Sequence, residues 1–189
     1  GGGLIVRAAV IILYIQFYAK PLKQEAQGQT FTAEQYFRAE DYDKALNGDG
    51  NALGFIQIID EYGDKAGEAI YLYAGICQLQ LGNATEAISY LDKYRTDDAI
   101  LTARAIACTG DAHSILNNFS EALKYYLQAA NHADNVYAAA YLLKAGIICE
   151  EMGKPQEALT YYKRIKENYP STPEGYEIDK YISRIEVAE

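Results

Sequence analysis

The side chains best suited to chemistry are scarce, because this chain of 189 residues has only two histidines. His113 has no cysteine or carboxylate beside it at the spacing that metal ligands need, so a buried structural role is expected. His132 follows the end of a predicted helix, where an imidazole interacts with the last backbone carbonyls. Neither histidine predicts a metal site.

The three cysteines, Cys77, Cys108 and Cys149, lie on three predicted helices among small apolar residues. Their odd number and the lack of a Cys-x-x-Cys pair favour inert buried thiols over a disulfide or a metal centre. We therefore expect no metal and no cofactor.

The segment Asn47-Gly-Asp-Gly-Asn51 resembles a calcium-binding loop, but two required positions hold the wrong residues. Ala52 replaces the turning glycine, and Ile58 replaces the glutamate that would bind calcium through both oxygens. The segment is instead predicted to be a turn between two helices. Phosphate loops, nucleophile elbows and paired His-Glu motifs are also missing from the sequence, so we expect no catalytic residues and no enzyme activity.

Composition narrows the class of protein further. Half of the residues are hydrophobic and 23% are charged, which excludes a disordered chain. The net charge of −9 argues against nucleic-acid binding, which needs a basic face. The length suits one domain or one short repeat array, and the residue usage favours helices.

An internal period of 35 to 36 residues relates three Glu-Ala pairs, whose alanines are Ala87, Ala122 and Ala158. A glycine precedes each alanine by twelve residues, and a residue that tolerates a left-handed backbone precedes it by five. The glycines are Gly75, Gly110 and Gly146, and the turn residues are Gly82, Asn117 and Gly153. Two antiparallel helices can cross closely only where such small side chains meet. Each glycine is therefore predicted to face the alanine of its own unit.

The segment from Gly75 to Ile88, GICQLQLGNATEAI, resembles the helix–turn–helix signature of the tetratricopeptide repeat family. The resemblance implies an all-α, right-handed superhelical α-solenoid. A degenerate first unit is set on Ala52, with Glu40 in place of the small residue.

The expected organisation is an apolar segment at 1–19, a stalk at 20–32 and a repeat array at 33–189. Four repeats are assigned to 33–66, 67–101, 102–137 and 138–170, followed by a capping helix at 173–187. Helix pairs are expected at 33–46 with 52–62, 67–81 with 84–94, 99–116 with 120–131, and 136–152 with 155–168.

Residues 4–18 are apolar except for Arg7 and Gln16. At 1.5 Å per residue they form about 22 Å of helix, short of a hydrocarbon core of about 30 Å. We interpret them as a truncated membrane anchor with an aromatic belt; an export-signal remnant and a helix packed on the array or on a second copy are the alternatives. Arg7 on one side and Lys20 and Lys23 on the other flank the stretch about equally, so charge does not orient it.

The resemblance also implies that the first helices of the pairs line a concave groove for a partner segment. The groove residues in this register are Phe37, Asp41, Lys44, Leu72, Ile76, Leu79, Gln80, Arg104, Asp111, Ser114, Leu143, Ile147, Glu150 and Glu151. The Lys and Asn clamp that binds chaperone tails in some family members is absent from these positions. A partly apolar, acidic groove suits an amphipathic or hydrophobic protein segment with basic flanks.

The sequence as a whole is similar to membrane-anchored periplasmic repeat proteins of bacteria, such as the ancillary subunit of the secretion translocon. This similarity implies a non-catalytic adaptor on the inner membrane, with one N-terminal span and a periplasmic array. The alternative is a soluble scaffold that self-associates, for example as a homodimer, with its apolar N-terminal helix in the groove or exchanged between copies.

Overall fold

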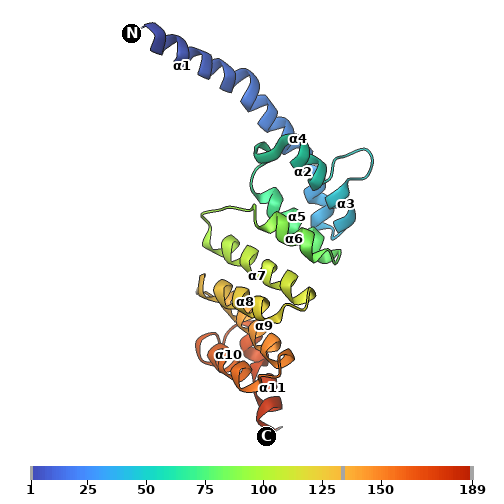
Figure 1. Cartoon of the computed structure of the whole chain (residues 1–189), viewed down its shortest axis with the longest axis vertical. Helices are drawn as coiled ribbons and strands as arrows, with labels where there is room; N and C mark the ends of the chain where they lie inside the picture. The colour runs from blue at the N-terminus through green and yellow to red at the C-terminus, as the bar shows by residue number, and fades with distance from the viewer. Residues whose placement is uncertain (1, 133–134, 188–189) are drawn as a thin grey trace. The chain divides into compact units, whose positions relative to one another are not determined.

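The computed structural model describes residues 2–132 and 135–187, and within them every regular element is a helix. The chain divides into two compact units, unit 1 (Gly1–Leu81) and unit 2 (Gly82–Glu189). Unit 1 contains α1 (Gly2–Tyr14), η1 (Ile15–Ala19), α2 (Lys20–Arg38), α3 (Tyr42–Asn47), α4 (Phe55–Tyr62), η2 (Gly63–Ala66) and α5 (Ala69–Gln80) (Figure 1). Unit 2 contains α6 (Ala84–Leu91), α7 (Ala99–Ile115), α8 (Phe119–His132), α9 (Ala138–Glu151), α10 (Pro155–Asn168) and α11 (Pro173–Val187).

From α5 onward, the predicted helix pairs agree with the structure to within three residues at each end. The capping helix is also confirmed as α11. The Thr172 hydroxyl accepts a hydrogen bond from the Gly175 amide at 3.0 Å, and Pro173 is the first helical residue. This combination is typical of a helix start, because the cap satisfies a free amide and proline has none to satisfy.

Three helix-to-helix turns share one backbone hydrogen-bond pattern, in which an amide donates to the carbonyl five residues earlier. The donors and acceptors are Asp41 to Tyr36 at 3.0 Å, Asn118 to His113 at 2.8 Å and Lys154 to Cys149 at 2.8 Å. The residue before each donor has a positive φ, at Glu40, Asn117 and Gly153. This is the Schellman ending, in which one left-handed residue stops the helix and satisfies its last carbonyls.

The first repeat is therefore set on Ala45, and the prediction of one helix over 33–46 is wrong. Glu40 ends α2 in the left-handed conformation, and the Asp41 side chain caps α3 by accepting from the Lys44 amide. Ala45 follows Glu40 by five residues, and Ala33 precedes Ala45 by twelve; both are fully buried. The first helix of this repeat is α2, which begins at Lys20 inside the segment expected to be a stalk.

The glycine-rich segment 48–54 is not the turn between the two helices of this repeat. It interrupts the second helix, separating α3 from α4. The Asp49 carboxylate organises the segment by accepting hydrogen bonds from the Asn51 and Ala52 amides at 2.8 and 2.7 Å, and from the Tyr36 hydroxyl at 2.7 Å. These donors, the tyrosine first, lower the pKa of Asp49 to about 2. The loop is thus an insertion in the first repeat that is ordered by its own hydrogen bonds.

Tyrosine rings lie on the two glycines of unit 2 that recur at the repeat spacing, Gly110 and Gly146. Gly75, Gly110 and Gly146 are all buried, as predicted. A Cβ atom at Gly110 would lie 2.8 Å from the Tyr126 ring, and one at Gly146 would overlap the Tyr162 ring. In unit 2 the glycine therefore receives the tyrosine four residues after the expected alanine. Gly75 and Ala87 lie in different units, and their pairing stays a prediction.

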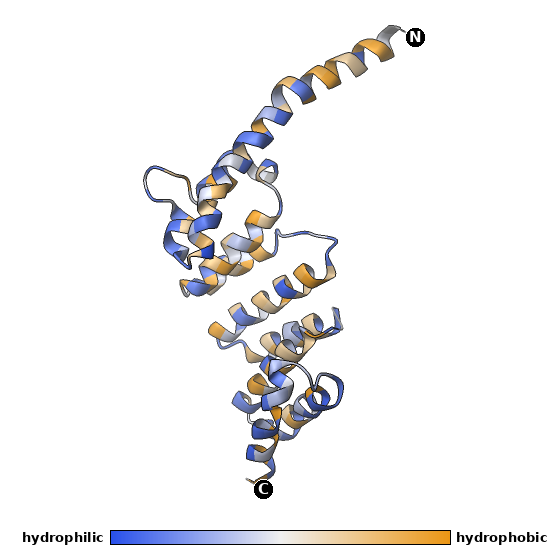
Figure 2. Cartoon of the chain, turned by 180° about the vertical axis from the view of Figure 1, so that it is seen from behind, coloured by the Kyte–Doolittle hydropathy of each residue, from blue (hydrophilic) through white to orange (hydrophobic). Residues whose placement is uncertain are grey.

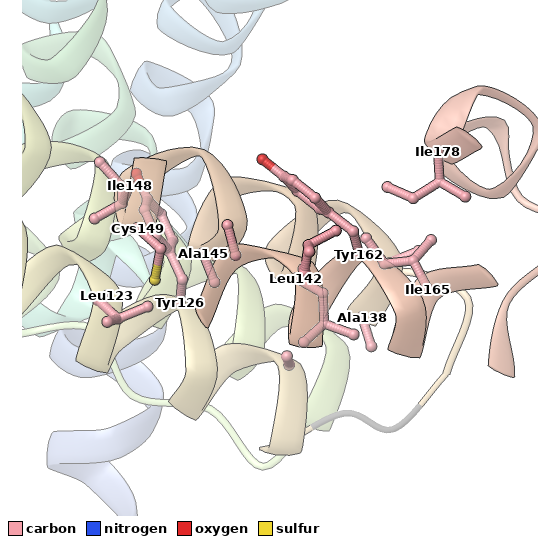
Figure 3. Packing of buried hydrophobic residues seen from close by; sticks show 14 of the residues in the cluster. Leu123, Tyr126, Ala138, Leu142, Ala145, Ile148, Cys149, Tyr162, Ile165 and Ile178 are labelled. Atoms are coloured by element: carbon pink, nitrogen blue, oxygen red, sulfur yellow. The ribbon is translucent and has the colours of Figure 1, made fainter. Parts of the chain in front are cut away.

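The core of unit 2 continues this packing from α8 through α11. Tyr162, Leu142, Ile165 and Ile178 are almost completely buried and belong to one apolar cluster (Figure 3). Alanines fill the close helix contacts between these larger side chains. Burial of this kind is the main stabilising contribution in a helical repeat, because each pair covers the apolar face of its neighbour.

The N-terminal helix continues from Gly3 to Arg38 through the π-helical segment η1. It is long and apolar enough to cross a membrane by length and composition. The large apolar side chains of residues 4–18 are 44–80% exposed. Figure 2 shows the apolar colouring of this part of the helix.

Candidate functional site

Ion pairs join three helices of unit 2: α7 and α9, which are the first helices of their repeats, and the capping helix α11. The Lys144 ammonium on α9 lies 2.6 Å from the Asp111 carboxylate on α7. The Arg184 guanidinium on α11 contacts both oxygens of Glu150 on α9, at 2.6 and 2.8 Å. These two pairs define a continuous surface across the three helices.

The same two carboxylates also accept hydrogen bonds from tyrosines on the second helices of the repeats. Tyr126 on α8 donates its hydroxyl to Asp111 at 2.8 Å, and Tyr162 on α10 donates to Glu150 at 2.6 Å. Burial first, and the adjacent carboxylate second, raise the pKa of the Tyr126 phenol; burial and the bond to Glu150 do the same for the pKa of Tyr162. Both phenols therefore stay protonated and act as donors. Asp111 and Glu150 thus link neighbouring helices, and each carboxylate already has a cation and a tyrosine hydroxyl as partners within the protein.

A hollow of about 350 Å³ opens on this surface between α9 and α11. Its lining residues are Ile147, Glu150, Glu151, Tyr181 and Arg184. Ile147 is 38% exposed, and Glu151 is exposed and makes no ion pair with any described residue. The Tyr181 ring packs against Tyr162 at 5.3 Å between centroids and lies 5.2 Å from the Arg184 guanidinium. The hollow thus offers an apolar contact, an aromatic wall and one unpaired carboxylate.

Of the groove residues predicted for unit 2, Ile147, Glu150 and Glu151 are brought together in this hollow. Arg104 is exposed on α7, and Ser114 and Leu143 are half-buried. Tyr181 and Arg184 were missed by the sequence reasoning. The spacing of charged residues could have indicated Arg184. It follows Glu150 by 34 residues, much as Lys144 follows its partner Asp111 by 33, and both spacings are close to the repeat length.

Most of the groove residues predicted for unit 1 are buried or already paired with another side chain. Leu72 and Ile76 are only 3% and 7% exposed, so their assignment to a free surface is wrong. Phe37 packs against Tyr73 with ring centroids 4.9 Å apart. Leu79 is half-buried, and Gln80 is exposed.

Two further predicted groove residues of unit 1 form a local pair. The Lys44 ammonium lies 2.6 Å from the Asp41 carboxylate, which also caps α3. This ion pair holds the pKa of Asp41 below its usual value and raises that of Lys44. The pair is a helix-start contact, so it contributes no free charge to a binding surface.

His113 and the cysteines lie where structural roles are expected, and His132 is the exposed last residue of α8. His113 stacks on Tyr125 with centroids 5.2 Å apart. Cys77 and Cys149 are buried and Cys108 is half-buried; burial raises their pKa values to about 12, 11 and 11 respectively. Within the described residues, no group of three or more His, Cys, Asp or Glu side chains could hold a metal ion.

Comparison with known proteins supports the repeat assignment. Two profiles of the tetratricopeptide repeat family match the chain, one over residues 69–98 and one over residues 109–173. No curated protein sequence matches it significantly.

Two solved structures have a similar fold. One, described as the crystal structure of MamA, is 18% identical and superimposes with a TM-score of 0.61 over 82% of this chain and 92% of that one. The other, described as the crystal structure of MamA protein, is also 18% identical, with a TM-score of 0.62 over 88% and 87%. At this identity the likeness concerns the fold alone. The chain therefore carries tetratricopeptide repeats, which serve protein–protein interaction, and has the all-helical fold of a solenoid built from them.

Proposed function

We propose that this protein is a non-catalytic scaffold that binds a partner segment on the surface formed by α7, α9 and α11, and that its N-terminal helix tethers it to a membrane. The hollow lined by Ile147, Glu151 and Tyr181 carries the first part of the proposal. The hollow lies between α9, which is the first helix of its repeat, and the capping helix α11, and this family holds its partners on the first helices.

The hollow favours a partner of particular chemistry. Ile147 and Tyr181 provide apolar and aromatic contacts, whereas Arg184 is already paired with Glu150. Glu151 is the exposed acidic group beside them. A bound segment is therefore an amphipathic helix or an extended apolar stretch that also carries a lysine or arginine for Glu151.

The tether rests on the large apolar side chains of residues 4–18, which are 44–80% exposed in the described structure. A patch of this size costs free energy in water and is removed from it by a bilayer. By its resemblance to membrane-anchored envelope proteins, the proposal assigns the tether to the bacterial inner membrane and the repeats to the periplasm.

Site-specific photo-crosslinking tests the binding surface. A photoreactive phenylalanine analogue replaces Ile147 in the full chain, and the matched control carries it at Glu167, which is exposed on α10. We expect a discrete adduct from position 147 that is absent from position 167. The adduct should weaken at least several-fold when Glu151→Lys is added, because the partner's cation then meets a like charge.

Equal adducts from both positions, or an adduct that Glu151→Lys leaves unchanged, would reject this surface as the binding site. Circular dichroism of each variant shows whether helix content is preserved, so that loss of binding is separated from loss of fold.

The second candidate function, a soluble self-associating scaffold, is favoured by the same exposed apolar helix, since a second copy would also cover it. Carbonate washing separates the two. A tethered protein stays in the membrane pellet, whereas a soluble oligomer enters the supernatant and shows a mass in light scattering that rises with concentration. The charged variant Ile11→Lys with Ile12→Lys should release the tethered protein from the pellet.

A further inference from the structure

Building on the proposed tether, we infer that the first repeat is fixed against the membrane surface, with Lys65 among the phosphate groups of the phospholipid headgroups. The segment 20–32, which the sequence suggested as a stalk, is a helical part of α2 that packs on the first repeat.

Burial along the N-terminal helix shows where its surroundings change. None of the residues in the apolar window is buried, and the large apolar side chains are exposed on every side of the helix. From Ala26 onward one face is buried, through Ala26, Thr30 and Ala33. The spacing of four and three residues is that of one helix face packed on its own unit. The helix thus leaves the protein interior at about the turn that contains Leu22.

Lys65 belongs to another part of unit 1 but lies beside the N-terminal helix close to the end of its apolar segment. It lies in η2, more than 40 residues after the apolar segment, yet its ammonium is 5.9 Å from the centre of the Tyr18 ring. Tyr18 is the last residue of the apolar segment 4–18 and stacks on Tyr14 with centroids 5.4 Å apart. Tyrosines of this kind are enriched at the boundary between the bilayer and water. If the apolar segment lies in the bilayer, Lys65 is placed at its edge.

The chemistry of this edge suits lipid phosphates. Lys20 and Lys23 are exposed and make no ion pair with any described residue. A lysine at the boundary keeps its stem along apolar surface and directs its ammonium toward the headgroups. Lys65 adds a third ammonium at this level from a different element.

The apolar segment and the first repeat are connected by one unbroken helix, which continues through the π-helical segment η1 and past Pro21, a residue with no amide to donate. The helix is continuous from Gly3 to Arg38, and across η1 the Lys20 amide still donates to the Ile15 carbonyl. Beyond the boundary, the Tyr62 hydroxyl on α4 donates to Glu25 on α2 at 3.3 Å. The apolar segment and the first helix of the repeat are therefore parts of one continuous helix.

The chain offers a matched control for this geometry. Lys44 lies over the Tyr36 ring at 5.5 Å, as Lys65 lies over Tyr18. Eighteen residues of the same helix separate the two tyrosines, which corresponds to about 27 Å along its axis. If this helix crosses the bilayer near its normal, position 44 lies well outside the headgroup layer, whereas position 65 lies within it.

Fluorescence quenching by headgroup-labelled lipid measures this difference. The full chain carries Lys65→Cys or Lys44→Cys with a small fluorophore, and it is reconstituted into phosphatidylcholine and phosphatidylglycerol vesicles that contain nitroxide-headgroup phosphatidylcholine. We expect most of the emission from position 65 to be quenched and that from position 44 to be retained. The native thiols, with raised pKa values, should react slowly, and the wild-type chain gives their background.

A third variant with a short Gly-Ser insertion after Ala19 isolates the role of rigidity. It should remain in the carbonate pellet but lose the quenching at position 65. If position 65 is unquenched in the uninterrupted chain while a label at Phe17→Cys is quenched, the tether stands and this inference is wrong. If a label at position 17 is also unquenched and the protein washes out, both the tether and this inference fail.

Discussion

The repeat pairs of unit 2 and the first repeat of unit 1 bring two helices together by different means. In the pairs α7–α8 and α9–α10, a glycine on the first helix lies under a tyrosine ring from the second. In the pair α2–α3, Ala33 takes the place of the glycine, and α3 is only six residues long. The turns are the same, since each ends in a left-handed residue and a Schellman hydrogen bond.

This difference moves the aromatic packing of unit 1 to other elements. Phe37, Phe55 and Tyr73 pack together from α2, α4 and α5, with ring centroids 4.9 to 6.3 Å apart. The loop 48–54 makes this possible, because it ends α3 early and starts α4 with Phe55. The glycine–tyrosine contact is thus one way to pack the two helices of a repeat against each other. The feature common to the repeats is the turn together with the small residues that precede and follow it.

The largest expected effect is at Gly146 in unit 2. Gly146→Ala adds a methyl group that would overlap the Tyr162 ring, and the ring cannot withdraw easily because its hydroxyl is bonded to Glu150. We expect a loss of about 1–3 kcal/mol in the free energy of local unfolding. Hydrogen exchange followed by mass spectrometry on the full chain should show faster exchange in peptides from α9 and α10.

Gly28→Ala in unit 1 is the matched control, because it makes the same chemical change inside a helix. No atom lies within 4 Å of a Cβ atom at this position. Alanine there should stabilise α2 by about 0.5–1 kcal/mol through its helix propensity. If both substitutions have the same sign, close packing at Gly146 is not what requires the glycine.

The second largest effect on stability is expected from the Tyr162 hydroxyl, which donates a hydrogen bond to Glu150. Tyr162→Phe keeps the ring on Gly146 but removes the donor at 2.6 Å from the carboxylate. We expect a loss of about 1–2 kcal/mol, because the acceptor is charged and partly buried. The measurement is again local hydrogen exchange, here in α9, α10 and α11.

Tyr161→Phe, one residue earlier on α10, is its control. The Tyr161 hydroxyl is 3.3 Å from Glu157 on the same helix, so this bond joins no second element. Its removal should change stability by less than about 0.5 kcal/mol. Equal losses from the two variants would mean that the hydroxyl of Tyr162 does not brace the repeats.

The fold of unit 2 could be predicted from the sequence because its markers agree with each other. Glu-Ala pairs, glycines and left-handed turn residues repeat at one spacing, and the helices follow them closely. The first repeat escaped this reasoning because its left-handed residue is Glu40, a residue type that rarely adopts that conformation. Gly48 and Gly50 in the inserted loop looked like the missing turn and shifted the register by seven residues.

The candidate site was predicted in part for a related reason. Ile147, Glu150 and Glu151 were predicted to share one surface, and all three line the hollow between α9 and α11, because the register of α9 follows clearly from its neighbours in sequence. Leu72 and Ile76 were predicted to be exposed but are buried. The helix α5 is apolar and buried around most of its circumference, so the sequence pattern does not indicate which face is exposed. Arg184 was missed because the capping helix was considered only for its apolar residues.

The smallest expected effect tests the unusual turn of unit 1 directly. Glu40 has a φ of 60°, which costs a residue with a Cβ atom about 1 kcal/mol that glycine does not pay. Glu40→Gly should therefore stabilise the first repeat by about 1 kcal/mol, seen as slower hydrogen exchange in α2 and α3. Gln35→Gly, an exposed site inside α2, should do the reverse by a similar amount because glycine weakens a helix interior. Destabilisation by both variants would show that the Glu40 side chain contributes more than its backbone strain removes, and the repeats would then differ in their turns as well as in their packing.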